Sequence, residues 1–175
     1  MKFLVDGMLG KLARWLRLLG HNVEYSNRLN DAQLIAIAKK ERRILLTRDL
    51  ELYQQATAKG INAFYLEGKT EAERLANLAK RFHIVLSIDM AASRCTKCNV
   101  VVMPVLKENV AEKVEKSTFS NYEDFWECPK CGQIYWQGAH WTKIRKTLEA
   151  AKEKLEVQKK GVYSVSSMSH FKGTS

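Results

Sequence analysis

Four cysteines form the most specific chemical pattern in this sequence. They occur as two Cys-x-x-Cys pairs, Cys95 with Cys98 and Cys128 with Cys131, separated by about thirty residues. Four thiolates with this spacing predict a tetrahedral Zn²⁺ site with Zn–S distances of about 2.3 Å. Because such a site leaves no coordination position open, we expect the ion to be structural. A redox-active pair is disfavoured, since neither pair opens a helix after a strand as in a thioredoxin-like fold.

Three aspartates form a second candidate site. Asp6 follows the apolar run 3–5, Asp49 follows the run 44–46 closely, and Asp31 lies in the first turn of an expected helix. Carboxylates brought to about 5 Å from one another repel by roughly 3 kcal/mol per pair at an effective dielectric of about 20, which favours a bound cation. Their oxygens suit Mg²⁺ or Mn²⁺, which can orient a water for attack on a phosphodiester.

Each of these aspartates also has a purely structural interpretation. Asp6 could begin a turn, Asp31 could stabilise a helix dipole, and Asp49 could cap the helix that follows it. The three acids together, in this order on a βα scaffold, favour the metal site. Glu51 and Asp89 are weaker candidates for a fourth ligand, because an acid such as Glu51 on a helix is most often a solvated charge and Asp89 could simply end a strand.

Basic residues follow the first aspartate at helical spacing. Lys11, Arg14 and Arg17 recur every three residues, and we expect them to position the phosphates beside the one that is cut. The alternative is the ordinary polar face of an amphipathic helix. Arg48 could also contact phosphate or pair with a neighbouring acid, and Thr47 could orient an acid by hydrogen bonding.

The cysteine-rich segment is rich in aromatic and basic residues. Its aromatic residues are Trp126, Tyr135, Trp136 and Trp141, and its basic residues include Lys97, Lys130, Lys143, Arg145 and Lys146. The aromatic rings could stack on unpaired bases, but packing of a small core around the metal is the favoured interpretation. With four cysteines present, His140 is interpreted as a packed or surface residue rather than a zinc ligand.

The elements that must position these residues alternate in type up to about residue 88. Apolar runs predict strands at 3–5, 23–25, 44–46, 61–66 and 84–86. Helical patterns lie between them at 8–19, 31–40, 50–60 and 70–82, two of them opened by capping boxes. This alternation predicts an α/β fold, with a mainly parallel sheet flanked by helices on both faces and a functional crevice at the carboxyl ends of its strands.

The chain is predicted to have three parts. Residues 1–92 form the α/β domain, residues 93–141 form a zinc ribbon, and residues 142–175 form a C-terminal helix and a flexible tail. The helical pattern itself extends from His140 to about Lys160, and the Ser-rich tail begins at Gly161.

Charge and hydropathy narrow the functional classes. The 175 residues contain 29 Lys and Arg against 19 Asp and Glu, a formal net charge of +10. This excess favours a partner with dense negative charge, above all nucleic acid. A soluble basic protein without such a partner is the alternative. No apolar run of about 18 residues and no signal peptide is present, so we expect a cytoplasmic protein without a membrane span.

Two groups of segments together resemble a known family. The stretches FLVDGMLGKLARWLRLLGHNVEY and ILLTRDLEL, with Asp31 heading a helix between them, resemble the PIN-like ribonuclease domain of the Mut-seven C-terminal type. The stretches SRCTKCN and FWECPKCGQIYWQGAHW resemble the zinc ribbon that closes that domain. The resemblance covers about residues 1–141.

The resemblance implies a metal-dependent endoribonuclease with a structural Zn²⁺ and a catalytic Mg²⁺ or Mn²⁺. Carried over residue by residue, the family's three acids are Asp6, Asp31 and Asp49, and Glu51 is the one position for a fourth. RNA is then the expected partner, alone or within a ribonucleoprotein or ribosome. Three alternatives stay open: a non-catalytic RNA- or ribosome-binding protein, the toxin of a toxin–antitoxin pair, and a protein-interaction adaptor that uses only the ribbon.

Overall fold

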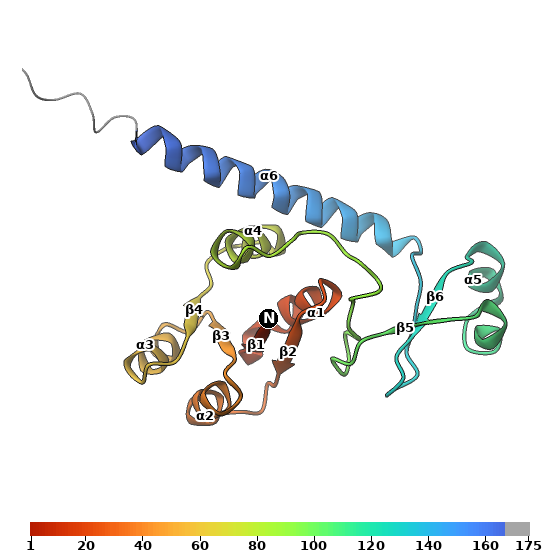
Figure 1. Ribbon diagram of the computed structural model, residues 1–175, viewed down its shortest axis with the longest axis horizontal. Coiled ribbons are helices and arrows are strands. Elements are labelled where there is room, and N and C mark those ends of the chain that lie inside the picture. Colours follow the sequence, from red (N-terminus) through yellow and green to blue (C-terminus); the bar gives the residue numbers. More distant parts are fainter. Residues whose placement is uncertain (167–175) are drawn as a thin grey trace, which may run out of the picture.

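A four-stranded parallel sheet forms the centre of the computed structural model, which describes residues 1–166 and the side chains of residues 1–160. The strand order is β2-β1-β3-β4 (Figure 1), and the strands are β1 (Lys2–Val5), β2 (Asn22–Tyr25), β3 (Ile44–Thr47) and β4 (Ala63–Tyr65). The predicted α/β fold with a parallel sheet is therefore confirmed.

The fifth predicted strand is wrong. Residues 84–86 form no strand, although Ile84 and Leu86 are buried and Val85 is 73% exposed. Ile84 and Leu86 point into a buried core that they share with several helices, which explains the alternation, but the segment pairs with no strand of the described sheets. It carries the chain from the last helix of the α/β domain to the cysteine-rich part.

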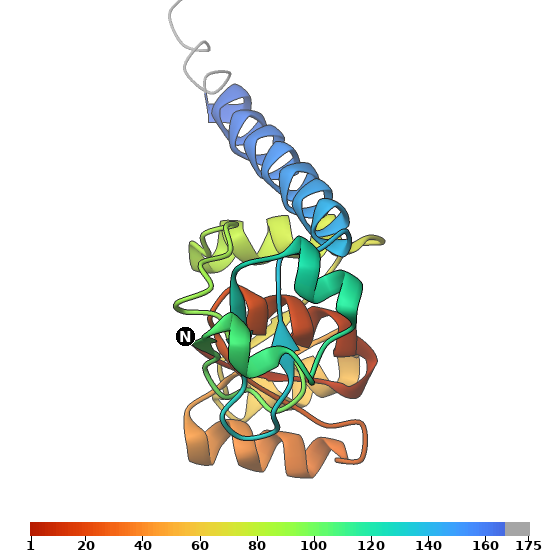
Figure 2. The ribbon, with the colours of Figure 1, turned by 90° about the vertical axis from the view of Figure 1, so that its right-hand side faces the viewer.

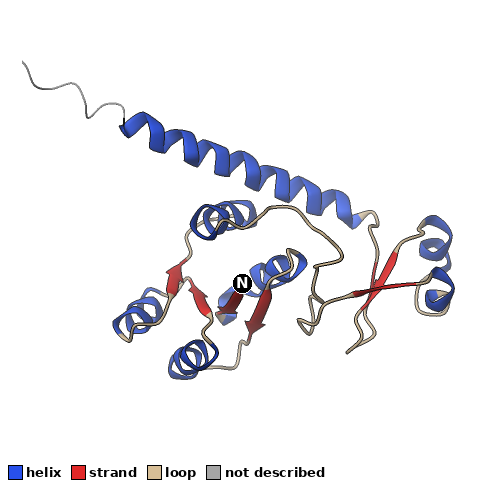
Figure 3. Ribbon diagram, viewed as in Figure 1, coloured by secondary structure: helices blue, strands red, loops and turns tan. Residues whose placement is uncertain are grey.

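Helices cover both faces of the sheet (Figures 1 and 3). They are the short 3-10 helix η1 (Gly7–Leu9), α1 (Gly10–Leu18), α2 (Asp31–Glu41), α3 (Leu50–Ala58) and α4 (Glu71–Phe82). The strands alternate between two cores, because successive side chains point to opposite faces. Phe3 and Val5 pack with α1 and α4, whereas Leu4 packs with α2 and α3.

Two helix starts are fixed by the predicted capping boxes. The Asn30 side chain accepts a hydrogen bond from the backbone N–H of Gln33 (2.9 Å). In return, the backbone N–H of Asn30 donates to the Gln33 side-chain oxygen (3.0 Å). Thr70 and Glu73 make the same reciprocal pair at the start of α4. Both boxes satisfy backbone donors that a helix start would otherwise leave open.

A small antiparallel sheet follows the α/β domain. Its strands, in the order β5-β6-β7, are β5 (Met103–Val105), β6 (Phe125–Glu127) and β7 (Ile134–Tyr135), with η2 (Lys107–Val110) and α5 (Lys116–Asn121) inserted between the first two. Val110, Phe125 and Ile134 form its buried core. The four cysteines lie in loops beside this sheet, as in a zinc ribbon.

The C-terminal helix α6 (His140–Ser166) packs back onto the α/β domain. Figure 2 shows that it then extends beyond the rest of the molecule. Leu148 and Ala151 are buried in the same core as α1 and α4, and Lys154 pairs with Glu73 of α4 at 3.3 Å. The predicted helix is confirmed and is longer than predicted, since it includes the first residues of the expected tail. The remainder of that tail, residues 167–175, lies outside the described residues.

The first cysteine pair covers the outer edge of the sheet. Strand β2 has β1 as its one neighbour, so the backbone groups on its other side need partners from elsewhere. Asn99, with a left-handed φ of 66°, accepts a hydrogen bond from the Val23 N–H (2.9 Å), and the Arg17 guanidinium donates to the Val23 carbonyl (2.7 and 3.1 Å). The cysteine-rich part is thereby bonded directly to the α/β domain.

No helix in the described part of the chain combines the length and the apolar character that crossing a bilayer requires.

Candidate functional site

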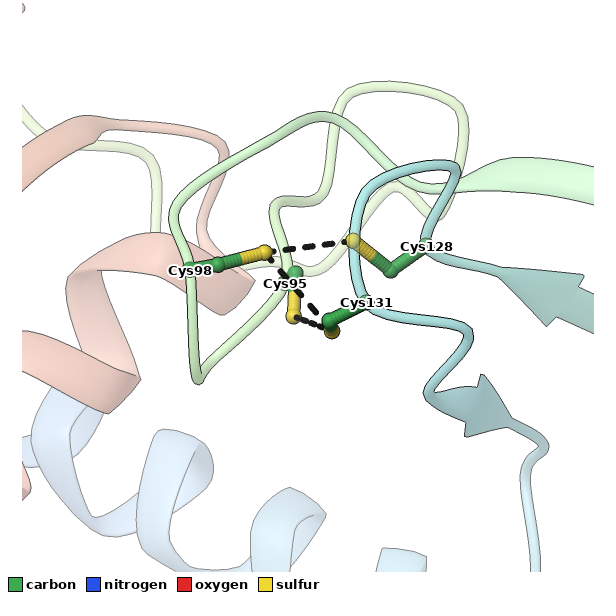
Figure 4. A group of neighbouring side chains, drawn as sticks. All are labelled: Cys95, Cys98, Cys128 and Cys131. Atoms are coloured by element: carbon green, nitrogen blue, oxygen red, sulfur yellow. Dashed lines mark hydrogen bonds between the residues drawn. The ribbon is translucent and has the colours of Figure 1, made fainter.

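The four cysteine thiols gather at one point (Figure 4). Their sulfur atoms all lie within 4.8 Å of one another. Three of the Sγ–Sγ distances are 3.6 Å (Cys95 to Cys131), 3.2 Å (Cys98 to Cys128) and 3.7 Å (Cys98 to Cys131). Four sulfurs placed tetrahedrally at about 2.3 Å from a Zn²⁺ ion would be about 3.8 Å apart. The cluster therefore has the donor type and nearly the spacing that a metal ion such as zinc requires.

Tyr135 supports this cluster with a hydrogen bond. Its hydroxyl donates to the Cys95 Sγ (3.1 Å) and accepts from the backbone N–H of Thr96 (3.0 Å). Burial opposes ionisation of the Cys95 thiol, but the bonds from Tyr135 and from nearby backbone N–H groups outweigh it and lower its pKa to about 6. A thiolate is the form that binds metal. The sequence offered one signal for this role, the position of Tyr135 four residues after Cys131.

Arg17, which the sequence predicts as a phosphate-binding residue, is instead buried against the cysteine-rich part. Its side chain is 6% exposed, and it donates to the carbonyls of Val23 and Thr96 (2.8 Å), with a longer contact to Lys97 (3.4 Å). The prediction failed because Arg17 is the position in its helix that faces the cysteine-rich loop rather than solvent. Its role is to join α1, β2 and the first cysteine pair.

The acidic site lies at the carboxyl ends of β1 and β3, which are neighbours in the sheet. Thr47, fully buried at the end of β3, donates from its hydroxyl to Asp6 Oδ2 (2.9 Å) and accepts from the backbone N–H of Asp49 (2.9 Å). One hydroxyl thus links the two acids and orients the first. Asp6 is half-buried and Asp49 is exposed, so both carboxylates can be reached from solvent.

Asp49 is also a helix cap, which the sequence had offered as the alternative. Its Oδ1 accepts from the backbone N–H groups of Glu51 (2.8 Å) and Leu52 (3.1 Å), and its Oδ2 takes no part in the cap. The two roles are compatible, because one oxygen can fix the side chain while the other faces a ligand.

Asp31 is the third acid at this edge. It is the first residue of α2, on the face of the sheet that α3 also covers. In the described residues, however, no three carboxylates have oxygens within 4.8 Å of one another, and the four cysteines are the one group that meets this criterion. The expected direct convergence is therefore not seen. Asp6 and Asp49 suit a hydrated Mg²⁺, which needs one or two carboxylates and keeps several waters.

The weaker acidic candidates differ in position. Glu51 is exposed in the first turn of α3, close to Asp49 in the chain. Asp89 accepts a hydrogen bond from the Ala91 N–H (2.9 Å) within a turn whose Ser93 bonds to the end of α1. Because α1 runs back from the carboxyl edge of the sheet, this places Asp89 at the opposite edge and removes it from the candidate ligands.

Three predicted phosphate-binding residues are exposed. Arg48 lies between Thr47 and Asp49 at the acidic edge. Lys11 and Arg14 lie on α1, on the opposite face of the sheet from α2 and α3, and they line a cavity shared with α6. The structure thus separates one basic residue beside the acids from a second basic surface over α1.

One comparison with known proteins found a match. The family model of the Mut7-C RNAse domain matches residues 1–148. The match covers the sheet, both cysteine pairs and the first part of α6. Neither the curated proteins nor the solved structures gave a match.

Proposed function

Because the chain belongs to the family of the Mut7-C RNAse domain, we propose that it is a metal-dependent endoribonuclease. The family gives a ribonuclease-type domain and RNA as its substrate. The observation that carries the finer proposal is the hydrogen-bonded arrangement of Asp6, Thr47 and Asp49 at the adjoining ends of two parallel strands. Ligands in open α/β sheets bind at this edge.

In the proposed mechanism, Asp6, Asp49 and Asp31 would hold a Mg²⁺ or Mn²⁺ ion at the carboxyl edge of the sheet. Such an ion supplies charge stabilisation and an oriented water for attack on phosphorus. Thr47 keeps the Asp6 carboxylate in place through its 2.9 Å hydrogen bond. Arg48, exposed beside the acids, binds a phosphate oxygen of the substrate.

The zinc ribbon is proposed to act structurally. Cys95, Cys98, Cys128 and Cys131 would hold Zn²⁺ with no position left for substrate. Through Thr96 the ribbon is bonded to Arg17, so the ion would also stabilise the α1 side of the nuclease domain.

The test is cleavage of a circular, end-free RNA in the presence of Mg²⁺ or Mn²⁺. A circle is cut by an endonuclease and resists an exonuclease, so linear product supports the proposal directly. Asp6→Asn and Asp49→Asn should lower the cleavage rate at least a hundredfold, a loss of about 2.7 kcal/mol of transition-state stabilisation. Asp89→Asn is the matched control, because it makes the same chemical change at the opposite edge and should cut at the wild-type rate.

A non-catalytic RNA- or ribosome-binding protein is the second candidate. It is favoured by the net charge of +10, and by the finding that the carboxylate oxygens of the three aspartates do not form a close cluster. Salt-sensitive RNA binding without any metal-dependent cutting would establish this candidate and reject the first.

A further inference from the structure

A groove runs from α1 across the start of α6 to the ribbon. Its first section has a volume of about 410 Å³ and its second about 280 Å³. Leu18, His140 and Ile144 line both sections, so the two sections adjoin. Figure 1 shows the start of α6 above α1 and next to the ribbon. The groove therefore uses the α/β domain, α6 and the ribbon together.

The first section of the groove is positively charged. Lys11 and Arg14 of α1 face Lys143 of α6 across it, and all three side chains are exposed. The one acid in its lining, Glu71, forms an ion pair with Arg74. Three cations against one compensated carboxylate give a surface that attracts a chain of phosphates.

The second section is aromatic. Tyr135 and Trp136 are half-buried there, and the exposed ring of His140 stands edge-on to Trp136 at a centroid distance of 6.1 Å. The Trp136 ring packs directly on the backbone of Gly138, where an added Cβ would lie 2.6 Å from Nε1. The ring therefore lies against the Gly138 backbone, and its side chain is only partly buried.

We propose that this groove binds single-stranded RNA, with phosphates on Lys11, Arg14 and Lys143 and a base against His140 and Trp136. Proteins that bind single-stranded nucleic acid combine basic residues for the phosphates with aromatic side chains on which the bases stack. A duplex does not offer its base faces in this way, because they are stacked inside the helix. The proposal rests on the proposed function for its ligand. It adds a binding path away from the acids, to which α6 and the ribbon contribute. One end of the path is Lys11, at the start of α1, which follows Asp6 by five residues in the chain.

The experiment measures binding of a fluorescent twelve-nucleotide oligouridine by anisotropy. All proteins carry Asp6→Asn and no divalent ion is added, so cleavage does not interfere. One phosphate contact on a single strand contributes about 0.7 to the slope of log K against log salt, or about fivefold in affinity at 0.1 M salt. Lys143→Gln should therefore bind about fivefold more weakly, with the slope reduced by about 0.7.

Lys159→Gln is the matched control. It removes the same charge from the same helix, about 24 Å further along at 1.5 Å per residue, where Lys159 pairs with Glu156 (2.9 Å). It should bind as tightly as the parent protein. His140→Ala should weaken binding with an unchanged salt slope, since stacking releases no counterions.

The proposal that this groove binds RNA would be overturned if Lys143→Gln bound RNA as tightly as the parent protein. It would also be overturned if Lys143→Gln and Lys159→Gln lost the same affinity. Tighter binding of a duplex of the same length would overturn it as well. These binding results are independent of catalysis. If the groove binds RNA as described but the protein never cuts circular RNA, the proposed nuclease activity is rejected and the proposed RNA-binding groove is retained.

Discussion

Replacing Arg17 with methionine should destabilise the protein without removing a phosphate contact. The side chain donates to two backbone carbonyls at short distance, Val23 O and Thr96 O, and methionine keeps the buried aliphatic volume but no donor. Each buried carbonyl left without a donor costs about 1–3 kcal/mol. Burial lowers the pKa of Arg17, which means that the charge is partly desolvated, and methionine removes that cost. The net loss should be about 2–4 kcal/mol.

The assay is urea unfolding of zinc-loaded protein, followed by a thermal melt. For a chain of this size each kcal/mol shifts Tm by about 2–4 °C, so the expected decrease is about 4–16 °C. Arg14→Met is the control, because Arg14 lies one turn earlier on α1 and is exposed. Its free energy of unfolding should stay within about 0.5 kcal/mol of wild type.

RNA binding by the two variants should show the opposite pattern. Arg14→Met should lose about fivefold in affinity at 0.1 M salt, whereas folded Arg17→Met should keep the wild-type salt slope. A variant of Arg17 that unfolds like wild type but binds RNA weakly would refute the assignment. It would return Arg17 to the phosphate-binding residues.

Three further predictions concern single side chains. Thr47→Val should lower the free energy of unfolding by about 2–3 kcal/mol and reduce the cleavage rate, because it removes the donor that fixes Asp6; urea unfolding and initial rates measure both, and wild-type values would contradict the role. Tyr135→Phe should lower zinc affinity about 10- to 100-fold in competition with a chromophoric chelator, and unchanged affinity would show that the hydroxyl does not support the cluster. Burial lowers the pKa of His21 to about 4 from its ordinary 6.5. Stability should fall as pH drops from 6.5 towards 4, because the unfolded chain takes up a proton that the folded chain excludes; His21→Gln should fall less steeply, and parallel pH profiles would contradict this.

The α/β domain could be predicted from sequence because its signals are local. Apolar runs, capping residues at Asn30 and Thr70, and glycines after helices define each element within a few residues of chain. The same signals misled at residues 84–86, where burial alternates as in a strand but no partner strand is adjacent. Hydrophobic periodicity indicates which side chains are buried. Whether a segment pairs as a β-strand depends on whether another strand lies beside its backbone.

The contacts between the parts could not be predicted in this way. Arg17 reads as one more charge on an amphipathic helix, and Asn99 as a loop residue, yet both bond across more than seventy residues of sequence. The same limit applies to the acids. Chain order places Asp6, Asp31 and Asp49 at one edge of the sheet, but whether their oxygens meet depends on side-chain directions, and Asp49 turns one oxygen to its own helix.

The cover over β2 has a consequence for protein quality control. Asn99 accepts from the Val23 N–H only while the first cysteine loop keeps its shape, and that loop also covers the strand beside Arg17. Zinc starvation would release that loop and leave a strand edge open to a strand from another molecule. The damage would then be self-association that grows with protein concentration, and it would be set by the supply of metal to newly made chains.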